Sequence, residues 1–309
     1  VVPASPVRVT IFDKRLPMET FLIRISKIID EGAFVTRPAL KLSANLSFLF
    51  TEFDFGERFE RAARAGFSGV EYMFPYACDR DELCALLREN GLLQVLHNLP
   101  AGDWAAGERG IACLPGREAE FRESVALGID FARTLGCRQL NCLAGIAPAG
   151  IADEELHATL TGNLRYAAER LARHDIRLLI EPINSRVDIP GFWLDTPAKG
   201  LALIAELAIP NLWLQYDIYH AQVMAGDLAR TIETHIDRIA HIQLADNPGR
   251  NEPGSGEINY PFLFDLLGRL GYDGWLGCEY RPALANTESS LGWAREWLAP
   301  LPRARADRP

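Results

Sequence analysis

Short apolar runs alternate with amphipathic stretches along the chain from residue 41 to about residue 300. The apolar runs are nearly continuous, which is typical of strands that are buried on both faces of a parallel sheet. The pattern predicts eight strands, at 42–50, 69–74, 92–98, 138–144, 176–182, 212–217, 240–246 and 275–280.

The stretches between the strands place apolar residues at positions i, i+3, i+4 and i+7, the spacing of an amphipathic helix. The clearest of these helices are 56–66, 79–90, 117–136, 154–174, 227–239 and 262–271. Eight strands that alternate with helices over about 260 residues predict an α/β fold, a single (β/α)8 TIM barrel. A doubly wound open sheet is the alternative, but no glycine-rich phosphate loop follows the first strand, which disfavours it.

Two long connections interrupt this regularity, at 98–116 after the third strand and at 246–260 after the seventh. Both are expected on the carboxyl-terminal face of the barrel, where barrel enzymes build their sites. Long loops rich in glycine and proline at this face are typical of lids, and plain surface excursions are the alternative.

The composition is that of an ordinary globular protein, with 48% hydrophobic and 24% charged residues among 309. The formal net charge of −9 argues against nucleic acid and anionic membranes as partners, because both require a basic surface. No run of about 18 apolar residues is present, so no membrane span is expected. The six cysteines form no CxxC pair, and buried reduced thiols in a cytoplasmic enzyme are expected.

Both ends of the chain fall outside the repeating pattern. Residues 1–40 fit no strand–helix unit and lack the regions of a signal peptide, so we expect a poorly packed extension before the barrel. The barrel is assigned to 41–300, and 301–309 are expected to form a polar tail.

Four polar residues end four consecutive predicted strands: Glu181, Asp217, Gln243 and Glu279, which are separated by 36, 26 and 36 residues. Each separation is about one strand–helix unit, so a barrel would bring the four side chains to one point at its mouth. All four offer oxygen atoms, which favours a hard cation such as Mg²⁺ or Mn²⁺. Carboxylates that face both a metal and a substrate are also suited to acid–base chemistry.

Several strings together resemble the hydroxypyruvate isomerase family of the xylose-isomerase-like barrels: NLPAGDWAAGERGIACLPG, IEPIN, YDIYHAQ, HIQLADNPGRNEPGSGEI and GCEY. The resemblance covers about residues 42–298. It implies that Glu181 and Glu279 are the catalytic pair that donates and accepts protons. It also implies that Glu181, Asp217, Gln243 and Glu279 hold the metal; Gln243 stands where the related sugar epimerases carry His.

The implied reaction interconverts hydroxypyruvate and 2-hydroxy-3-oxopropanoate (tartronate semialdehyde) through a cis-enediol(ate). A 2-oxo-tetronate isomerase or a ketose 3-epimerase is the alternative among enzymes. A barrel that only binds a sugar acid is a further alternative, against which the paired glutamates argue. The abasic-site endonuclease branch is disfavoured, since it would need more histidine ligands and a basic groove. The expected partner is a small 2-oxo or hydroxy acid, and self-association into a homo-oligomer stays open.

The substrate-binding candidates are His220, Arg281, Arg250 and His97. His220 lies three residues beyond Asp217 and matches a histidine that contacts substrate oxygen in the epimerase relatives. Either arginine would meet a carboxylate through two parallel hydrogen bonds, and Arg281 is preferred because it follows the Glu279 strand. His97 ends the third strand. Trp104 is expected to cap the pocket, whereas Asn45 and Glu71 are not taken as candidates.

Overall fold

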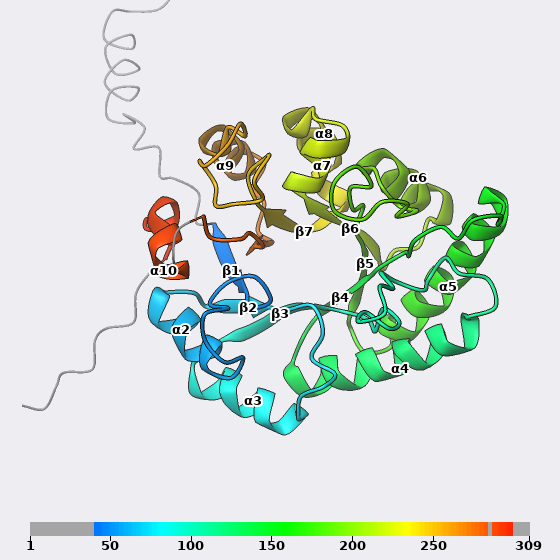
Figure 1. The fold of residues 1–309 in the computed structure, drawn as a ribbon, viewed down its shortest axis with the longest axis horizontal. Coiled ribbons are helices and arrows are strands. Elements are labelled where there is room, and N and C mark those ends of the chain that lie inside the picture. The colour runs from blue at the N-terminus through cyan, green and yellow to red at the C-terminus, as the bar shows by residue number, and fades with distance from the viewer. Residues whose placement is uncertain (1–39, 284–285, 299–309) are drawn as a thin grey trace, which may run out of the picture. The chain divides into compact units, whose positions relative to one another are not determined.

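The fold is a closed barrel of eight parallel strands that hydrogen-bond in chain order, β1 to β8 (Figure 1). A computed structural model describes residues 40–283 and 286–298. The strands are β1 (Lys41–Asn45), β2 (Gly69–Glu71), β3 (Leu93–Asn98), β4 (Gln139–Cys142), β5 (Arg177–Ile180), β6 (Leu212–Asp217), β7 (Ile239–Leu244) and β8 (Trp275–Cys278). β1 pairs with β8 from Lys41 opposite Trp275 to Ala44 opposite Cys278, so the sheet has no free edge. The predicted (β/α)8 barrel is confirmed.

Helices surround the strands (Figure 1). They are α2 (Glu57–Ala65), α3 (Arg80–Glu89), α4 (Glu118–Leu135), α5 (Asp153–Ala172), α6 (Pro197–Leu207), α7 (Ile218–Met224), α8 (Leu228–His235), α9 (Tyr260–Arg269) and α10 (Thr287–Ser290), with 3₁₀ turns η1 (Ile236–Arg238) and η2 (Leu291–Ala294). Within the part of the chain that the structure describes, no helix combines the length and apolar character needed to cross a membrane.

Local sequence explains where the helices begin and end. The Asp79 side chain accepts hydrogen bonds from the backbone N–H groups of Asp81 and Glu82, which caps the start of α3. α4 ends at Gly136, whose φ of 68° lies in the left-handed region that glycine adopts without strain.

The last helical position of the ring is taken by the short segments α10 and η2, which lie between α9 and α2 in Figure 1. Trp293 of η2 stacks on Phe264 of α9, with ring centroids 5.8 Å apart. Thr287 Oγ1 accepts a 2.6 Å hydrogen bond from the Phe50 backbone N–H. These contacts close the ring without a full-length eighth helix.

Several strands are shorter than predicted, and the first shows why. The prediction at 42–50 is wrong beyond Asn45, because the Asn45 carbonyl accepts hydrogen bonds from the N–H groups of Phe48 and Leu49 and turns the chain. Leu46, Leu49 and Phe50, which follow, are buried in this turn instead of in a strand. β5 likewise ends at Ile180, so Glu181 lies just past the strand.

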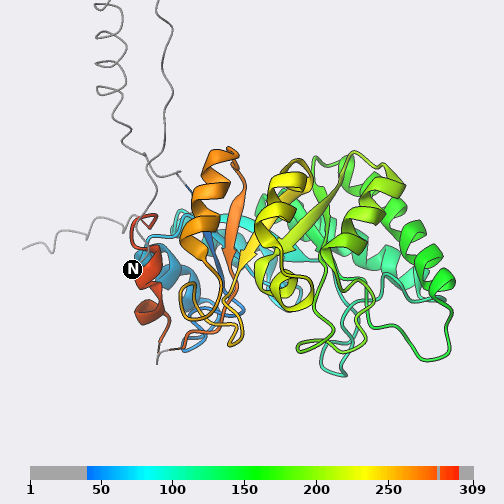
Figure 2. The same cartoon turned by 90° about the horizontal axis from the view of Figure 1, so that it is seen from above.

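The two long connections gather on one side of the barrel (Figure 2). They run between β3 and α4 and between β7 and α9, as expected from the sequence. The predicted extension at 1–40 (except Leu40) and the tail at 301–309 lie outside the described residues.

Candidate functional site

A cavity of about 330 Å³ lies at the carboxyl-terminal mouth of the barrel. Both long loops contribute to it, through Trp104 and Arg109 from the first and Arg250 from the second. Its charged lining consists of Glu71, Glu181, Asp188, Glu279, Arg109, Arg250 and Arg281. Trp104, which the sequence led us to expect as a cap on the pocket, is among the residues that line it.

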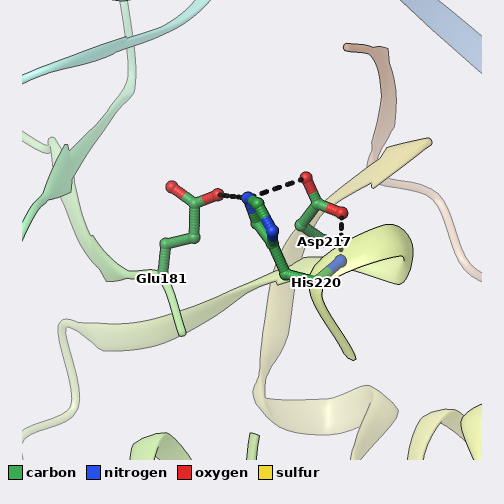
Figure 3. A group of neighbouring side chains, drawn as sticks. All are labelled: Glu181, Asp217 and His220. Atoms are coloured by element: carbon green, nitrogen blue, oxygen red, sulfur yellow. Dashed lines mark hydrogen bonds and ion pairs between the residues drawn. The ribbon is translucent and has the colours of Figure 1, made fainter. Parts of the chain in front are cut away.

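Three buried side chains converge beside this cavity: Glu181 after β5, Asp217 at the end of β6, and His220 in the first turn of α7 (Figure 3). Asp217 Oδ1 accepts a 3.0 Å hydrogen bond from the His220 backbone N–H, which starts α7 and fixes both residues. The His220 Nε2 atom lies 3.9 Å from Glu181 Oε1 and 3.7 Å from Asp217 Oδ2. One ligand atom from each residue lies within 4.8 Å of the others.

This trio has the properties of a divalent metal site. Burial, with repulsion from the Asp217 carboxylate, raises the pKa of Glu181 to about 8. Burial also raises the pKa of Asp217. Asp217 Oδ2 is a buried acceptor without a hydrogen-bond partner. A divalent cation would pair with this oxygen and offset the buried negative charge, so the residues present fit a metal; two carboxylates and an imidazole do not select its identity.

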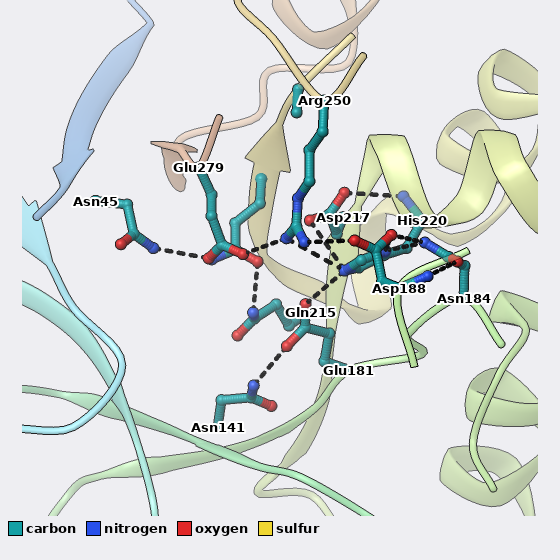
Figure 4. A network of polar contacts seen from close by, with 12 residues as sticks. Asn45, Asn141, Glu181, Asn184, Asp188, Gln215, Asp217, His220, Arg250 and Glu279 are labelled. Atoms are coloured by element: carbon teal, nitrogen blue, oxygen red, sulfur yellow. Dashed lines mark hydrogen bonds and ion pairs between the residues drawn. The ribbon is translucent and has the colours of Figure 1, made fainter. Parts of the chain in front are cut away.

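Arg250 is the cation at the centre of the site (Figure 4). Its Nη1 donates to Asp188 Oδ1 at 3.1 Å and its Nη2 donates to Glu279 Oε1 at 2.7 Å. The guanidinium also lies 4.9 Å from the ring centroid of Phe48. Burial alone would lower the pKa of Arg250, but the surrounding carboxylates, Glu279 first, raise it, so the side chain stays charged.

Amide groups hold the two glutamates. Glu279 Oε2 accepts hydrogen bonds from Asn45 Nδ2 at 2.7 Å and from Gln243 Nε2 at 2.6 Å. Glu181 Oε2 accepts from Asn141 Nδ2 at 2.7 Å. Each glutamate is thus anchored through one oxygen, and its other oxygen lies near His220 or Arg250. Burial raises the pKa of Glu279 well above its usual value, although Arg250 opposes the shift.

A further buried carboxylate, Glu71, shares the amide donors of Asn45 and Gln243 with Glu279. It accepts from Ser43 Oγ at 2.7 Å, Gln243 Nε2 at 2.8 Å and Asn45 Nδ2 at 3.2 Å. His241 Nε2 lies 2.9 Å from Glu71 Oε2, although not in the line of a well-aligned hydrogen bond. Burial would raise the pKa of Glu71, but His241 and the hydrogen bonds outweigh it and lower the pKa.

The structure divides the predicted metal ligands into two groups. Glu181 and Asp217 lie together with His220, which the sequence had suggested as a substrate contact. Gln243 instead donates to Glu71 and Glu279, and its Oε1 accepts from Gln215 Nε2 at 2.6 Å. The amide therefore supports Glu279 and is not part of the trio.

The substrate candidates are also divided. His220 and both arginines line the cavity, but the Arg250 side chain is largely buried between Asp188 and Glu279, whereas Arg281 is exposed. The order of preference from the sequence, Arg281 before Arg250, therefore does not match their burial. His97 does not border the cavity, because strand alternation turns Leu96 and Asn98 inward and His97 toward Tyr76, 6.0 Å away between ring centroids. Its position does not support a substrate role.

Sequence reasoning missed Asp188 and Arg109, and it set aside Glu71 and Asn45. Glu71 ends a strand just as Asp217 does, so the strand-end pattern includes it although it was not taken as a candidate. Asn45 ends β1 in the same way. Asp188 lies in an irregular loop after β5, and Arg109 lies within a string that carried the family resemblance; neither shows a periodic signal.

The chain matches the family model described as xylose isomerase-like TIM barrel over residues 59–297. It is 57% identical to a protein named hydroxypyruvate isomerase from Escherichia coli over 254 residues, which covers 82% of this chain and 98% of that protein. It is 45% identical to a 2-oxo-tetronate isomerase from Cupriavidus necator, covering 84% of this chain and 98% of the relative.

Among solved structures, an AP endonuclease, family 2, from Brucella melitensis is 45% identical, with a TM-score of 0.82, covering 84% of this chain and all of that one. Identity and coverage at this level, together with the family model, show common descent over the whole barrel. The chain therefore belongs to the hydroxypyruvate isomerase family within the xylose isomerase-like TIM barrels.

Proposed function

We propose that this protein is a hydroxypyruvate isomerase, which interconverts hydroxypyruvate and 2-hydroxy-3-oxopropanoate. The observation that carries the proposal is the pair Glu181 and Glu279, two buried carboxyl groups with raised pKa values that line one cavity. The 57% identity to the Escherichia coli protein of that name supports the choice of substrate. A protein that only bound a sugar acid would have no use for two such groups.

In this mechanism one glutamate removes a proton from C3 of hydroxypyruvate and a cis-enediolate forms. A proton then returns to C2, while the hydroxyl proton moves from O3 to O2, so the atoms balance. Arg250, which stays charged among the surrounding carboxylates, is placed to stabilise the negative charge of the enediolate. Acid–base catalysis of this kind contributes about 10²- to 10⁴-fold.

The test of the catalytic pair is substitution of each glutamate. Glu181→Gln and Glu279→Gln should each lower kcat by about 10²-fold or more, with the circular dichroism spectrum and Tm retained. Glu154→Gln, an exposed position on α5, is the control and should leave kcat unchanged. In D₂O, the wild-type product should carry deuterium at C2. Near wild-type kcat in either variant would remove that glutamate from the mechanism.

We also propose that Glu181, Asp217 and His220 hold a divalent cation, for which Mg²⁺ or Mn²⁺ is the expectation from sequence. A bound metal would polarise the substrate oxygens and stabilise the enediolate. Mn²⁺ titration followed by electron paramagnetic resonance tests the site without turnover. Asp217→Asn should weaken binding at least about tenfold. Gln243→Met should leave affinity within about threefold, whereas an equal loss in both variants would restore Gln243 to the ligand set.

A four-carbon 2-oxo-tetronate is the second candidate substrate. Its support is the 45% identity to the Cupriavidus necator enzyme and a cavity of about 330 Å³, which is ample for a three-carbon acid. A coupled assay that compares kcat/KM for hydroxypyruvate and for four-carbon oxo acids decides between them. The ketose 3-epimerase structures are at most 21% identical and support the fold alone.

The proposed setting is a cytoplasmic enzyme that acts on small acids. Although the similar Brucella melitensis structure is named an AP endonuclease, the net charge of −9 gives little support to a nucleic-acid substrate. Within the described residues, one group of His, Cys, Asp and Glu side chains has metal-binding geometry, namely Glu181, Asp217 and His220. A homo-oligomer remains compatible with this setting.

A further inference from the structure

Arg109 lies on the loop between β3 and α4, in the string GDWAAGERG that the catalytic assignment leaves unused. It lines the same cavity as Glu181 and Glu279. An acidic site that accepts a carboxylate substrate needs a cation that is not already neutralised by the protein's own carboxylates. The arginines that border the cavity, Arg109, Arg250 and Arg281, differ in this respect.

The backbone around Arg109 is held against the end of β4. Gly110 forms an antiparallel bridge with Ala144, and the Gly110 N–H donates to the Ala101 carbonyl at 3.0 Å. A Cβ atom on Gly110 would clash with the Leu143 carbonyl, and one on Gly145 would clash with the Gly110 carbonyl. Only glycine permits this approach, so the loop is fixed just beside Arg109.

The guanidinium of Arg109 is fixed as well. Its Nη1 donates to the carbonyl oxygens of Trp104 at 3.0 Å and Glu108 at 2.7 Å, and its Cζ lies 4.1 Å from the centroid of the Trp104 ring. Trp104 in turn packs on Phe74, with centroids 4.9 Å apart. The side chain has therefore lost most of its rotamer freedom before any substrate binds.

One edge of this guanidinium remains available. Within residues 40–283 and 286–298, Arg109 has no carboxylate partner, and its Nε and Nη2 groups make no hydrogen bond. The neighbouring Glu108 carboxylate is engaged by Arg117 and by the Asp103 N–H. Nε–H and Nη2–H are parallel donors on one edge, the arrangement that matches the two oxygens of a carboxylate.

The other two arginines that line the cavity are less suited to binding a substrate carboxylate. Arg250 is already paired with Glu279 and Asp188, so its charge is used within the site. Arg281 is exposed, and its side chain makes no hydrogen bond or ion pair with the described residues. Ordering this long side chain on a substrate would therefore cost conformational entropy that the fixed Arg109 does not lose.

We propose that Arg109 binds the carboxylate of the 2-oxo acid substrate through its Nε–H and Nη2–H groups and so selects acids over neutral sugars. The inference rests on the proposed isomerase function and adds the residue that recognises the substrate. Trp104 and the Gly110–Gly145 contact position this arginine. The catalytic glutamates then act on the carbons at the other end of the bound acid.

Steady-state kinetics of the full chain with hydroxypyruvate tests the proposal. Arg109→Gln should raise KM about 10- to 100-fold, the loss expected for one or two charge-assisted hydrogen bonds, with a smaller change in kcat. Arg109→Lys should raise KM about tenfold, because an ammonium group cannot make the two-point contact. Arg281→Gln removes the same charge from the same cavity and tests the rival arginine; its KM should rise less than that of Arg109→Gln, by under about threefold.

Chemical rescue adds a readout that a purely structural role would not move. Ethylguanidinium should lower the raised KM of Arg109→Ala and leave the KM of Arg281→Ala unchanged. The inference about Arg109 would be overturned if Arg109→Gln left KM unchanged, or if Arg281→Gln raised KM by the same factor. The proposed isomerase function would stand in either case, provided that the wild-type protein turns over hydroxypyruvate. A wild-type protein that turns over neither three- nor four-carbon oxo acids would overturn the function itself, and the inference with it.

Discussion

Glu71 controls the orientation of two amides that hold Glu279. The NH₂ groups of Asn45 and Gln243 each donate to both Glu71 and Glu279, so the carboxylate of Glu71 keeps their nitrogen atoms, and not their oxygens, turned toward Glu279. Gly277 leaves room for Glu71, since a Cβ atom there would overlap its carboxylate. A buried charge in the barrel interior is thus tied to the geometry of the proposed base.

Replacing Glu71 should therefore affect turnover more than binding. Glu71→Gln is expected to lower kcat about 10- to 100-fold, the usual range for residues that orient a functional group, while KM changes less than about threefold. Gly277→Ala should have the same effect because it displaces the same carboxylate. Gly162→Ala, at a helical glycine with open space around it, is the control. Equal losses of kcat in Gly162→Ala, or none in Glu71→Gln, would contradict this role.

His97 makes stability depend on pH. It is buried, neither ring nitrogen has a well-formed hydrogen bond, and burial lowers its pKa to about 3 from an unfolded value of 6.5. Between these values the unfolded chain binds a proton that the folded chain does not, so stability falls as the pH drops below about 6.5. At pH 5 the loss from this residue is about 2 kcal/mol.

We predict that replacing His97 weakens the dependence of the free energy of unfolding on pH. His97→Phe should lose about 2 kcal/mol less than the wild type when urea unfolding is compared at pH 7.5 and pH 5. Gly162→Ala, which removes no titratable group and adds a Cβ in open space, is the control and should keep the wild-type difference. If His97→Phe and the wild type lose the same stability on acidification, His97 does not titrate as burial implies.

Each long loop carries one buried or half-buried arginine to the site, and each is fixed to the barrel in a different way. In the loop after β7, Asp246 accepts hydrogen bonds from the N–H groups of Asn247, Gly254 and Ile258, which shapes the turn that carries Arg250. In the loop after β3, the backbone contact of Gly110 has that function. Both loops are ordered parts of the site and not plain surface excursions.

Two glycine substitutions, Gly107→Ala and Gly110→Ala, distinguish the effect of losing the Gly110 contact from the effect of backbone strain. Gly107 and Gly110 both have positive φ, 98° and 116°, but only a Cβ at 110 would meet other atoms. Gly107→Ala should cost about 1 kcal/mol of stability and leave KM unchanged. Gly110→Ala should also raise KM for the oxo acid about tenfold, because Arg109 shifts with the loop. Equal KM values in the two variants would contradict the loop's positioning role.

At the scale of the whole molecule, the barrel closes without the first 39 residues. β1 begins at Lys41 and pairs with both β2 and β8, and the site residues all lie from Asn45 onward. Deleting residues 1–39 should leave Tm within a few degrees and kcat/KM within about twofold of the full chain. An insoluble or inactive shortened chain would show that the segment supports the barrel or an oligomer.

Much of the barrel was predictable because its signals are local. Buried parallel strands are continuous apolar runs, and amphipathic helices repeat every 3.6 residues, so seven of the eight predicted strands have both ends within three residues of the observed ones. The predicted first strand extended too far because several apolar residues after Asn45 are buried in a turn. In the sequence, apolar residues that are buried in a turn look the same as apolar residues that are buried in a strand. The short α10 and η2 carry no periodic signal.

The sequence by itself determined the barrel, its two long loops and the position of acidic residues at strand ends, because chain order and periodicity decide which residues lie at the mouth. Only the tertiary structure decided which of them face one another. Side-chain direction placed His220 beside Glu181 and Asp217, turned Gln243 toward Glu71, and directed His97 away from the cavity. Those choices depend on strand register, on helix caps and on hydrogen bonds between distant residues, such as Gln243 and Glu71, which are 172 positions apart; no local pattern encodes them.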